Sequence, residues 1–554
     1  MSARGALLRN TFWYGLVTVG GLLTGVVMSV VLARGLGPAR MGEYSYVLWV
    51  GRTLTAIATL GFALATTRYT ATALAKGDAA LAWGFVQLLR RRQLATTAIV
   101  AAIAIPVMLL AAPGSLRWPL VVVCLALFPV ALEHIYSHAV YGGQRYELTA
   151  KASAVKMSLH LLAAVTVLSL GFDILGLVIA NTIGTTIACA VQRGSVRRIY
   201  PRAAAPVPDD ARAELRAYLV PLSVVVVLDA IVWDRSEVFF LRLWASPQDV
   251  AFYSLAFGLA TKAMVLPEVA VGALLPTFSA LHGRGASGEF RAVYRSALRH
   301  VALAAVAIAS IGGALAPGIV GLLYGEQYLP VAALFAALVS VAAVSSMRRV
   351  AWSALRGAGD RRWAVTATSL AAAVNLAAAA LLIPSGGVWG ALAANSAAQG
   401  VATLIAFAVM ARTHDCGFPI AAVARIALAG TLALVTTMAV LDGETHVLRL
   451  LVAGATGFTV YAGACAGLRV VGRAEWHVVS RTLRRRLGAR ERIGVPSRAR
   501  VRPGPGERLG GVRGHVGAPH DLGPRPAPAP RTSGAPGSEP FTKVPAPAAP
   551  PQGD

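Results

Sequence analysis

The stretch Leu36-Gly37-Pro38, followed by Gly42-Glu43-Tyr44-Ser45, has a near copy about 210 residues later. The copy reads Ala245-Ser246-Pro247, followed by Ala251-Phe252-Tyr253-Ser254. Each stretch lies just after one long apolar run and just before another. Short loops favour Gly and Pro in any protein, so a single similarity of this kind is weak evidence. The shared position between apolar runs nevertheless predicts a duplicated membrane unit, which is typical of transporters.

The composition agrees with a membrane location. Of the 554 residues, 56% are hydrophobic and 14% are charged, and the mean hydropathy is +0.63. These values exclude an ordinary soluble domain. The net charge of +26 does not indicate nucleic-acid binding, because the Arg residues fall between apolar runs and in the C-terminal region. Cys124, Cys189, Cys416 and Cys465 have no paired spacing and are interpreted as small hydrophobic residues.

Fourteen apolar runs are long enough to cross a bilayer as helices. The first is too long for the core of a signal peptide, so we expect it to be retained. The runs are 10–32, 44–65, 94–111, 119–141, 150–170, 174–191, 218–243, 250–275, 298–323, 329–355, 363–383, 387–410, 419–441 and 447–470.

The connecting segments predict the orientation of these helices. With the N-terminus inside the cell, the inner loops carry about 23 basic residues and the outer loops about 5. An odd number of missed helices would have disturbed this alternation. Both termini are therefore expected on the cytoplasmic side.

Two further similarities set the length of the repeat. Residues 137–153, which contain Gly143-Gln144-Arg145, parallel residues 353–369, and residues 176–181 parallel residues 390–395. The fold prediction is therefore an all-α polytopic membrane protein with two parallel six-helix repeats and two extra helices. The predicted parts are the first repeat (1–193), a cytoplasmic linker (194–217), the second repeat (218–412), the extra helix pair (413–470) and a disordered, basic, Pro/Ala/Gly-rich cytoplasmic tail (471–554).

At this point the chain resembles a known family, the multidrug/oligosaccharidyl-lipid/polysaccharide (MOP) exporter superfamily, and within it the Wzx-type polysaccharide biosynthesis flippases. The resemblance covers about residues 5–470, and Ala251 departs from it where the family usually has Gly. The matching residues are Ala33-Arg34-Gly35-Leu36-Gly37-Pro38, Gly61-Phe62-Ala63, Arg68-Tyr69, Asp234-Arg235, Tyr253-Ser254-Leu255-Ala256 and Leu355-Arg356-Gly357.

The resemblance implies transport without covalent chemistry, in the cytoplasmic membrane of a bacterium. An undecaprenyl-pyrophosphate-linked oligosaccharide for O-antigen, capsule or exopolysaccharide would be moved to the outer leaflet by alternating access. The implied partners are this lipid-linked glycan, membrane lipids, H⁺ or Na⁺ as coupling ion, and polysaccharide polymerases or glycosyltransferases. A multidrug exporter and a lipid II flippase are the alternatives within the superfamily. A polytopic enzyme would need a large outer or catalytic loop, and every predicted outer loop is short.

Ionisable residues inside predicted spans mark candidate sites, because such groups are costly in a bilayer unless they face water or a partner. In the helix predicted for run 218–243, Asp229, Asp234 and Glu237 share an arc of roughly 140°. We interpret these three acids as the residues that couple transport to H⁺ or Na⁺. No nucleotide-binding loop is present in the sequence, so the expected energy source is an ion gradient, the membrane potential or the substrate gradient.

Arg52, Arg235 and Lys262 are the candidates for binding the pyrophosphate head group, because Arg and Lys suit concentrated negative charge. An internal Asp234–Arg235 ion pair is the alternative. The expected turn and gating residues are Gly37, Pro38, Gly42, Tyr44, Pro247, Tyr253 and Pro267, the last as a kink before Glu268.

The remaining ionisable groups have structural interpretations. Lys156 is expected to extend its ammonium to the inner interface. Arg34, Arg68, Arg348 and Arg349 are expected at helix ends as topology signals. His134 and His138 stack at i and i+4 beside Glu133, but the order needed for a zinc enzyme is missing, so a wet vestibule or a packed pair is expected instead.

Overall fold

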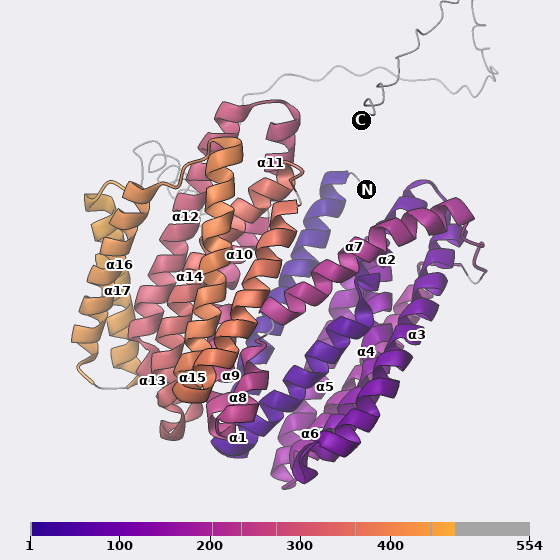
Figure 1. Cartoon of the computed structure of the whole chain (residues 1–554), viewed down its shortest axis with the longest axis horizontal. Coiled ribbons are helices and arrows are strands. Elements are labelled where there is room, and N and C mark those ends of the chain that lie inside the picture. Colours follow the sequence, from indigo (N-terminus) through magenta and orange to yellow (C-terminus); the bar gives the residue numbers. More distant parts are fainter. Residues whose placement is uncertain are drawn as a thin grey trace, which may run out of the picture. The chain divides into compact units, whose positions relative to one another are not determined.

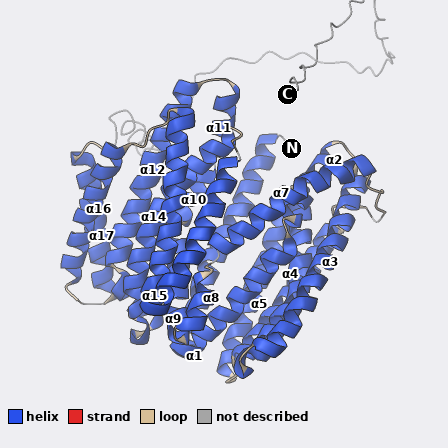
Figure 2. Ribbon diagram, viewed as in Figure 1, coloured by secondary structure: helices blue, strands red, loops and turns tan. Residues whose placement is uncertain are grey.

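The computed structural model describes residues 3–201, 203–233, 235–272, 274–360, 362–443 and 446–470. Every regular element in these residues is a helix (Figure 2), which confirms the predicted all-α class. The predicted tail, 471–554, lies outside the described residues.

The first half of the chain is organised by a break at Gly37. This glycine has φ 72° and ψ 169°, so α1 consists of two helices that meet there, and Pro38 opens the second of them. Asp78 and Asp173 cap α3 and α6 by accepting from the first free backbone N–H groups. The helices of this half are α1 (Ala3–Thr59), α2 (Phe62–Ala75), α3 (Ala79–Ala111), α4 (Gly114–Gly142), α5 (Tyr146–Ser169) and α6 (Ile174–Val196).

The second half contains more interrupted helices. Gly387, with φ 50° and ψ −128°, divides α15 into two helices in the way that Gly37 divides α1. Ser246 and Asp249 form a reciprocal capping box at the start of α9, and Pro247 occupies the first turn. The elements are α7 (Asp209–Trp233), α8 (Glu237–Trp244), α9 (Pro247–Ala263), α10 (Val265–Gly272), α11 (Leu274–Gly283), α12 (Ser287–Ala314), α13 (Ala316–Tyr324), the 3-10 turn η1 (Glu326–Tyr328), α14 (Pro330–Gly357) and α15 (Arg362–His414).

Each of the fourteen predicted helices corresponds to a helix, to one half of a helix kinked at glycine, or to a set of consecutive segments. In the described part of the chain, eleven helices are long and apolar enough to cross a membrane, and two of these, α1 and α15, each contain two predicted spans. The prediction was wrong about continuity in four places. Run 44–65 is divided between α1 and α2, run 218–243 between α7 and α8, and run 298–323 between α12 and α13. Run 250–275 is divided into α9, α10 and the start of α11. In addition, α7 begins at Asp209, inside the predicted linker.

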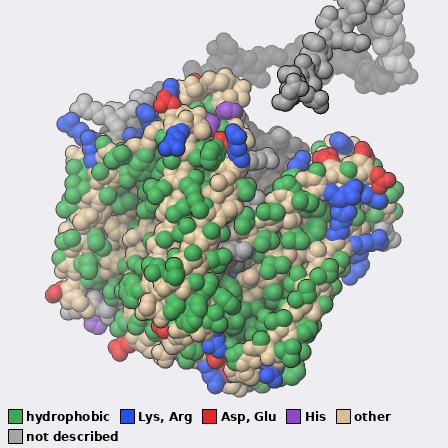
Figure 3. Space-filling view, in the orientation of Figure 1, with side chains coloured by type: hydrophobic (Ala, Val, Ile, Leu, Met, Phe, Trp, Pro, Cys, Tyr) green, Lys and Arg blue, Asp and Glu red, His purple; other side chains and the backbone are tan. Residues whose placement is uncertain are grey.

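Large apolar side chains cover the outside of the helices, as expected for a surface in contact with lipid. Leu110 is 86% exposed and Leu381 75% exposed. In Figure 3 hydrophobic side chains cover the middle of the face shown, whereas charged side chains gather toward its two ends. A polar end, an apolar middle and a second polar end are what a bilayer requires.

The two halves contact each other through α1 and α9, with α2–α6 on one side of them and α10–α15 on the other (Figure 1). They approach closely at Gly42, where a Cβ atom would lie 1.6 Å from the carbonyl oxygen of Pro247. The N-terminal part of α7 also packs against the first half, since Ser223 donates a 2.8 Å hydrogen bond to the backbone oxygen of Leu60.

The segment between the halves is anchored to the first half by a buried tyrosine. Tyr200 donates a 2.7 Å hydrogen bond to the backbone oxygen of Ala139. Burial raises the pKa of Tyr200 to about 12, so the hydroxyl keeps the proton that it donates. Tyr200 thereby joins the start of this segment to the last turns of α4.

The extra helices, α16 (Ile420–Leu441) and α17 (Val447–Gly467), pack on each other and on α12 (Figure 1). A Cβ atom at Gly457 would lie 2.0 Å from the Thr437 hydroxyl, so this glycine allows the two helices to approach closely. The pair lies against the second half, as an addition to the repeated unit.

Candidate functional site

The site is built around an interruption of the helix that carries most of the predicted site residues. Arg235 has φ 62°, a left-handed conformation that is costly for a residue with a side chain. The chain therefore leaves α7 after Trp233 and starts α8 at Glu237. Asp234 and the side chain of Asp229 lie outside the described residues, so their predicted roles stay predictions. The break also removes the basis for one shared acidic face, because Glu237 is not in helical register with α7.

Glu237 is completely buried in the second half and is held by two asparagines from α15. Asn375 donates a 2.6 Å hydrogen bond and Asn395 a 3.0 Å hydrogen bond to the same carboxylate oxygen, Oε1. Ser236 donates a 2.7 Å hydrogen bond to Asn375 Oδ1, which orients that amide. Tyr253 of α9, also completely buried, interacts with the same carboxylate. Side chains from α15 and α9, together with Ser236 just before α8, thus surround one buried acid.

The structure brings the three predicted cations together. Lys262 on α9 lies within electrostatic range of both Arg52 on α1 and Arg235 at the helix break. The Lys262 side chain runs along α1, since its Cε would be 3.4 Å from a Cβ atom at Gly25. Arg235 donates a long, 3.4 Å hydrogen bond to the backbone oxygen of Ser254. Arg52, Arg235 and Lys262 are called the cation group below.

The cation group lies between the halves, because Arg52 belongs to the first half and the other two members to the second. Arg235 lies over the ring of Phe257, 5.7 Å from its centroid. Tyr44 is buried within electrostatic range of Arg52. Three positive charges this close together are offset by neighbouring acids, by an anionic ligand or by both.

Four of the predicted turn residues, Gly37, Pro38, Gly42 and Pro247, lie where the two halves meet. Gly37 and Pro38 form the break in α1, and Gly42 packs on Pro247 at the start of α9. Pro267 lies in α10, three residues after the interruption at Met264. Proline cannot donate to the carbonyl four residues earlier, which explains an interruption at this point.

Further bonds between the halves lie beside this turn. Arg34 donates hydrogen bonds of 2.7 and 2.8 Å to the backbone oxygens of Leu322 and Leu323 at the end of α13. Tyr328 donates a 2.8 Å hydrogen bond to the backbone oxygen of Ala33, and Ser29 is 2.9 Å from the Tyr324 hydroxyl. The interpretation of Arg34 as a topology signal alone was therefore incomplete, because it binds the last turn of a helix in the other half.

A second polar group lies inside the first half. Lys156 is 2.5 Å from Glu133, and both side chains are mostly buried, so the expectation that Lys156 reaches the interface was wrong. His138 is 2.9 Å from the Thr67 hydroxyl, and His160 is 3.4 Å from Thr185. Among the described residues, no three His, Cys, Asp or Glu side chains are arranged to hold a metal ion.

Sequence reasoning missed four residues of the second half. Asn375, Asn395 and Gln399 are polar amides within apolar runs, a signal that predicts buried hydrogen bonds. Asn395 also ends one of the repeated stretches. Arg348 was placed at a helix end, but α14 continues to Gly357 and Arg348 is only 5% exposed.

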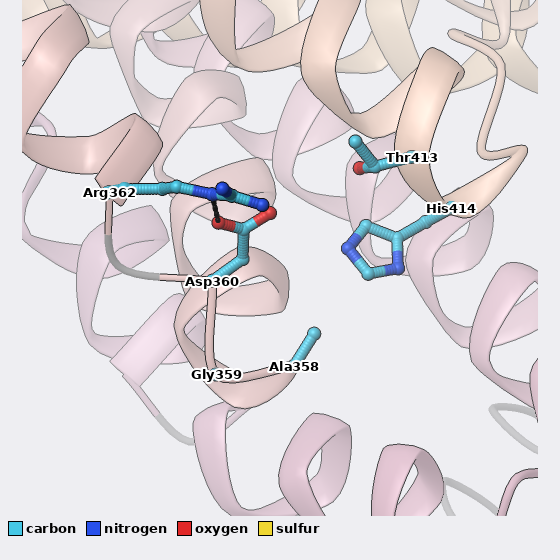
Figure 4. Close-up of a pocket in the computed structure, with 6 residues that line it drawn as sticks. All are labelled: Ala358, Gly359, Asp360, Arg362, Thr413 and His414. Atoms are coloured by element: carbon cyan, nitrogen blue, oxygen red, sulfur yellow. Dashed lines mark ion pairs between the residues drawn. The ribbon is translucent and has the colours of Figure 1, made fainter. Parts of the chain in front are cut away.

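An open cavity of about 550 Å³ lies where α14 is connected to α15. Figure 4 shows Asp360 turned toward Arg362, with His414 across the opening from them. The Asp360–Arg362 distance is 3.7 Å, and Arg362 is mostly exposed. No predicted site residue lines this cavity, so it is separate from the cation group.

Comparison with known proteins agrees with this architecture. Residues 7–282 match the model of a family described as "Polysaccharide biosynthesis protein". A comparison with curated proteins finds no match.

Solved structures share the fold at low sequence identity. An inward-facing multidrug resistance transporter of the MATE family, in the MOP superfamily, is 14% identical, with a TM-score of 0.63 over 71% of this chain and 94% of that one. The lipid II flippase MurJ, in an inward closed conformation, is 11% identical, with a TM-score of 0.61 over 82% of this chain and 98% of that one. A MOP superfamily transporter from Pyrococcus furiosus is 14% identical, with a TM-score of 0.56 over 74% of this chain and 95% of that one.

The family match and the shared fold confirm the resemblance noted in the sequence. The chain is a multi-pass membrane protein with the fold of MOP superfamily transporters, and its residues 7–282 match the family model described as "Polysaccharide biosynthesis protein".

Proposed function

We propose that this protein moves a polyprenyl-pyrophosphate-linked oligosaccharide from the cytoplasmic to the outer leaflet of a bacterial cytoplasmic membrane. The cation group between the halves is the observation that carries this proposal. Arg guanidinium groups bind phosphate oxygens in pairs, and a Lys ammonium adds a compact charge. Because both halves contribute to these three groups, they suit a pyrophosphate that is bound by both halves.

The contacts between the halves support alternating access. Arg34, Gly42 and Tyr328 all bind across the halves at the end that holds Gly37. With the orientation predicted from the loop charges, this end faces outward, and both termini lie in the cytoplasm. The outer side is then closed, and a lipid-linked substrate would enter from the cytoplasmic leaflet.

Glu237 is the proposed coupling residue. A buried carboxylate can bind H⁺ directly. It can also contribute oxygen ligands to Na⁺, together with the side-chain oxygens of Asn375 and Asn395. Glu237 follows the strained residue Arg235 by two positions, so a change in its charge acts next to a member of the cation group. Asp229 and Asp234 remain candidates for the same role.

The alternatives predict different ligands. A multidrug exporter for organic cations would bind its substrate through acidic groups, whereas Arg52, Arg235 and Lys262 are suited to phosphate oxygens. A lipid II flippase would bind a pyrophosphate head group as well, so the cation group alone does not separate it from a polysaccharide flippase. The family match over residues 7–282 favours a glycan for polysaccharide synthesis, with polymerases or glycosyltransferases as partners.

Deletion of the gene tests this function in cells. We expect a lipid-linked oligosaccharide to accumulate in the inner leaflet and surface polysaccharide to be lost. The wild-type gene should restore both, an Arg52→Gln/Lys262→Gln variant should not, and Lys76→Gln, at an exposed lysine, should act like wild type. Accumulation of lipid II instead would identify the alternative, and no accumulation of any lipid-linked saccharide would refute the proposal.

A further inference from the structure

Aromatic rings on α1 lie between the contact at Gly42 and the cation group. Gly42, Tyr46, Trp49 and Arg52 follow one another at intervals of three or four residues, so they share one helix face. Gly42 on this face packs on Pro247, so the face is directed toward the second half. Tyr46 and Trp49 stack with their ring centroids 6.1 Å apart. The first half thus places two aromatic rings next to Arg52, on the side of the Gly42 contact.

The second half adds an aromatic ring from α8, which lies beside α1 (Figure 1). Glu237 and Leu241 are completely buried on one side of α8, and Phe239, about 200° around the helix from Glu237, lies on the opposite side. The centroid of the Phe239 ring is 6.2 Å from that of Trp49. Phe239 is 42% exposed, so part of its ring is not covered by protein. It follows Arg235 by four residues, so each half places an aromatic ring about one turn from a member of the cation group.

Trp49 carries a hydrogen-bond donor that the protein does not use. Its Nε1 atom is buried, and in the described part of the chain it has no hydrogen-bond partner. A buried indole N–H normally has an acceptor, because leaving it without one costs free energy. A ligand oxygen beside the ring would supply this acceptor. The arrangement therefore points to a ligand that has both an apolar face and oxygen atoms.

A sugar ring has both properties, since its C–H groups form apolar faces and its substituents carry oxygens. We propose that Trp49 and Phe239 bind the sugar that is bonded directly to the pyrophosphate, with Trp49 Nε1 donating to an oxygen of that sugar. The proposal rests on the proposed function, because it places the pyrophosphate at the cation group. One helical turn rises about 5.4 Å, so the aromatic rings reach the first sugar before any later one. They recognise the ring of this sugar and not its charge.

Equilibrium binding to purified full-length protein in nanodiscs tests this site. The two probes are farnesyl pyrophosphate esterified at its terminal phosphate with glucose or with methanol, so both carry the same charge. We expect wild type to bind the glucosyl probe about tenfold more tightly than the methyl probe, because the sugar buries an apolar face and accepts a hydrogen bond. Trp49→Leu should reduce this preference to less than about twofold. Trp49→Phe, which keeps a ring but loses the N–H donor, should reduce it to about threefold.

Two further variants complete the experiment. Trp118→Leu is the matched control, because Trp118 is 59% exposed on α4 and should keep the wild-type preference. Phe239→Leu removes the ring that the second half contributes, so it should also reduce the preference, and it serves if the Trp49 variants do not fold. None of these variants should change the affinity for the methyl probe.

The outcomes separate sugar binding from packing. Equal affinity of wild type for the two probes would overturn the proposal, as would an unchanged preference in Trp49→Leu. Equal weakening of both probes by Trp49→Leu would assign Trp49 to packing between the halves and would also overturn it. Failure of folded wild-type protein to bind the methyl probe would instead refute the proposed function.

Discussion

Gly42 and Ala251, which occupy equivalent positions in the repeated turn, meet in the structure: a Cβ atom at Gly42 would lie 3.2 Å from the backbone nitrogen of Ala251. The two copies of the turn therefore contact each other through corresponding residues, as expected for parallel repeats related by an axis through this contact. Gly42 supplies the space for this approach, which explains how the second copy accommodates an alanine where the family usually has glycine.

Replacing Gly42 with Ala should separate α1 from α9. The new methyl group would overlap the Pro247 carbonyl oxygen, which cannot move without its helix. We expect a loss of about 1–3 kcal/mol, typical of overpacking, seen as a lower Tm of the purified protein. Gly312→Ala is the control, because a Cβ atom there has no neighbour within 4 Å. Equal Tm values for the two variants would contradict the close contact.

Replacing Glu237 with Gln should uncouple transport from the ion gradient. Glutamine keeps a side-chain oxygen to accept from Asn375 and Asn395, so the protein should fold. It cannot carry a negative charge to bind H⁺ or Na⁺. Transport in vesicles should therefore no longer respond to an imposed gradient, whereas Glu326→Gln, at an exposed acid, should respond like wild type. A gradient response retained by Glu237→Gln would exclude this residue from coupling.

Replacing Arg34 with Gln should weaken closure at the Gly37 end. The variant loses the guanidinium that binds the Leu322 and Leu323 oxygens, and a hydrogen bond from a charged group contributes about 1.5–3 kcal/mol. We expect a cysteine at position 29 to react faster with a membrane-impermeant maleimide added from that side. The four native cysteines are buried and should give little background.

Arg40→Gln is the matched control for this labelling experiment. Arg40 pairs with Asp173 at 2.6 Å, a contact within the first half that does not join it to the second. If Arg34→Gln leaves the labelling rate unchanged, or if Arg40→Gln raises it equally, the Arg34 contacts do not hold the halves together.

The Glu133–Lys156 pair should show strong coupling in a double-mutant cycle. Removing one partner leaves a mostly buried charge, so Glu133→Gln or Lys156→Met alone should lower stability by about 2–4 kcal/mol. The double variant should recover most of this loss, as measured by thermal unfolding in one detergent. Additive losses would show that the two side chains do not stabilise each other.

The sequence was sufficient to predict the helices and their duplication, because apolar length and repeated turns are local properties of the chain. It did not reveal the breaks at Arg235 and Met264, because a continuous helix and an interrupted helix can have the same pattern of apolar residues. The resulting error was the shared acidic face of Asp229, Asp234 and Glu237.

The candidate site was predicted only in part. Arg52, Arg235 and Lys262 stood out as charges within apolar runs, and the structure places them together. Asn375 and Asn395 lie 138 and 158 residues from Glu237 along the chain, so no local pattern connects them. Arg348 was wrongly placed at a helix end. Its helix continues to Gly357, and the sequence does not show that its side chain is buried.

Reconstitution tests the central claim most directly. Purified protein in liposomes should move a polyprenyl-pyrophosphate-linked oligosaccharide between leaflets, measured by its exposure to a membrane-impermeant glycosidase. We predict that wild type and Lys76→Gln expose the inner-leaflet glycan many times faster than protein-free liposomes, and that Arg52→Gln/Lys262→Gln does not. Exposure at the protein-free rate with folded wild-type protein and an imposed ion gradient would contradict the assignment as a lipid-linked oligosaccharide flippase.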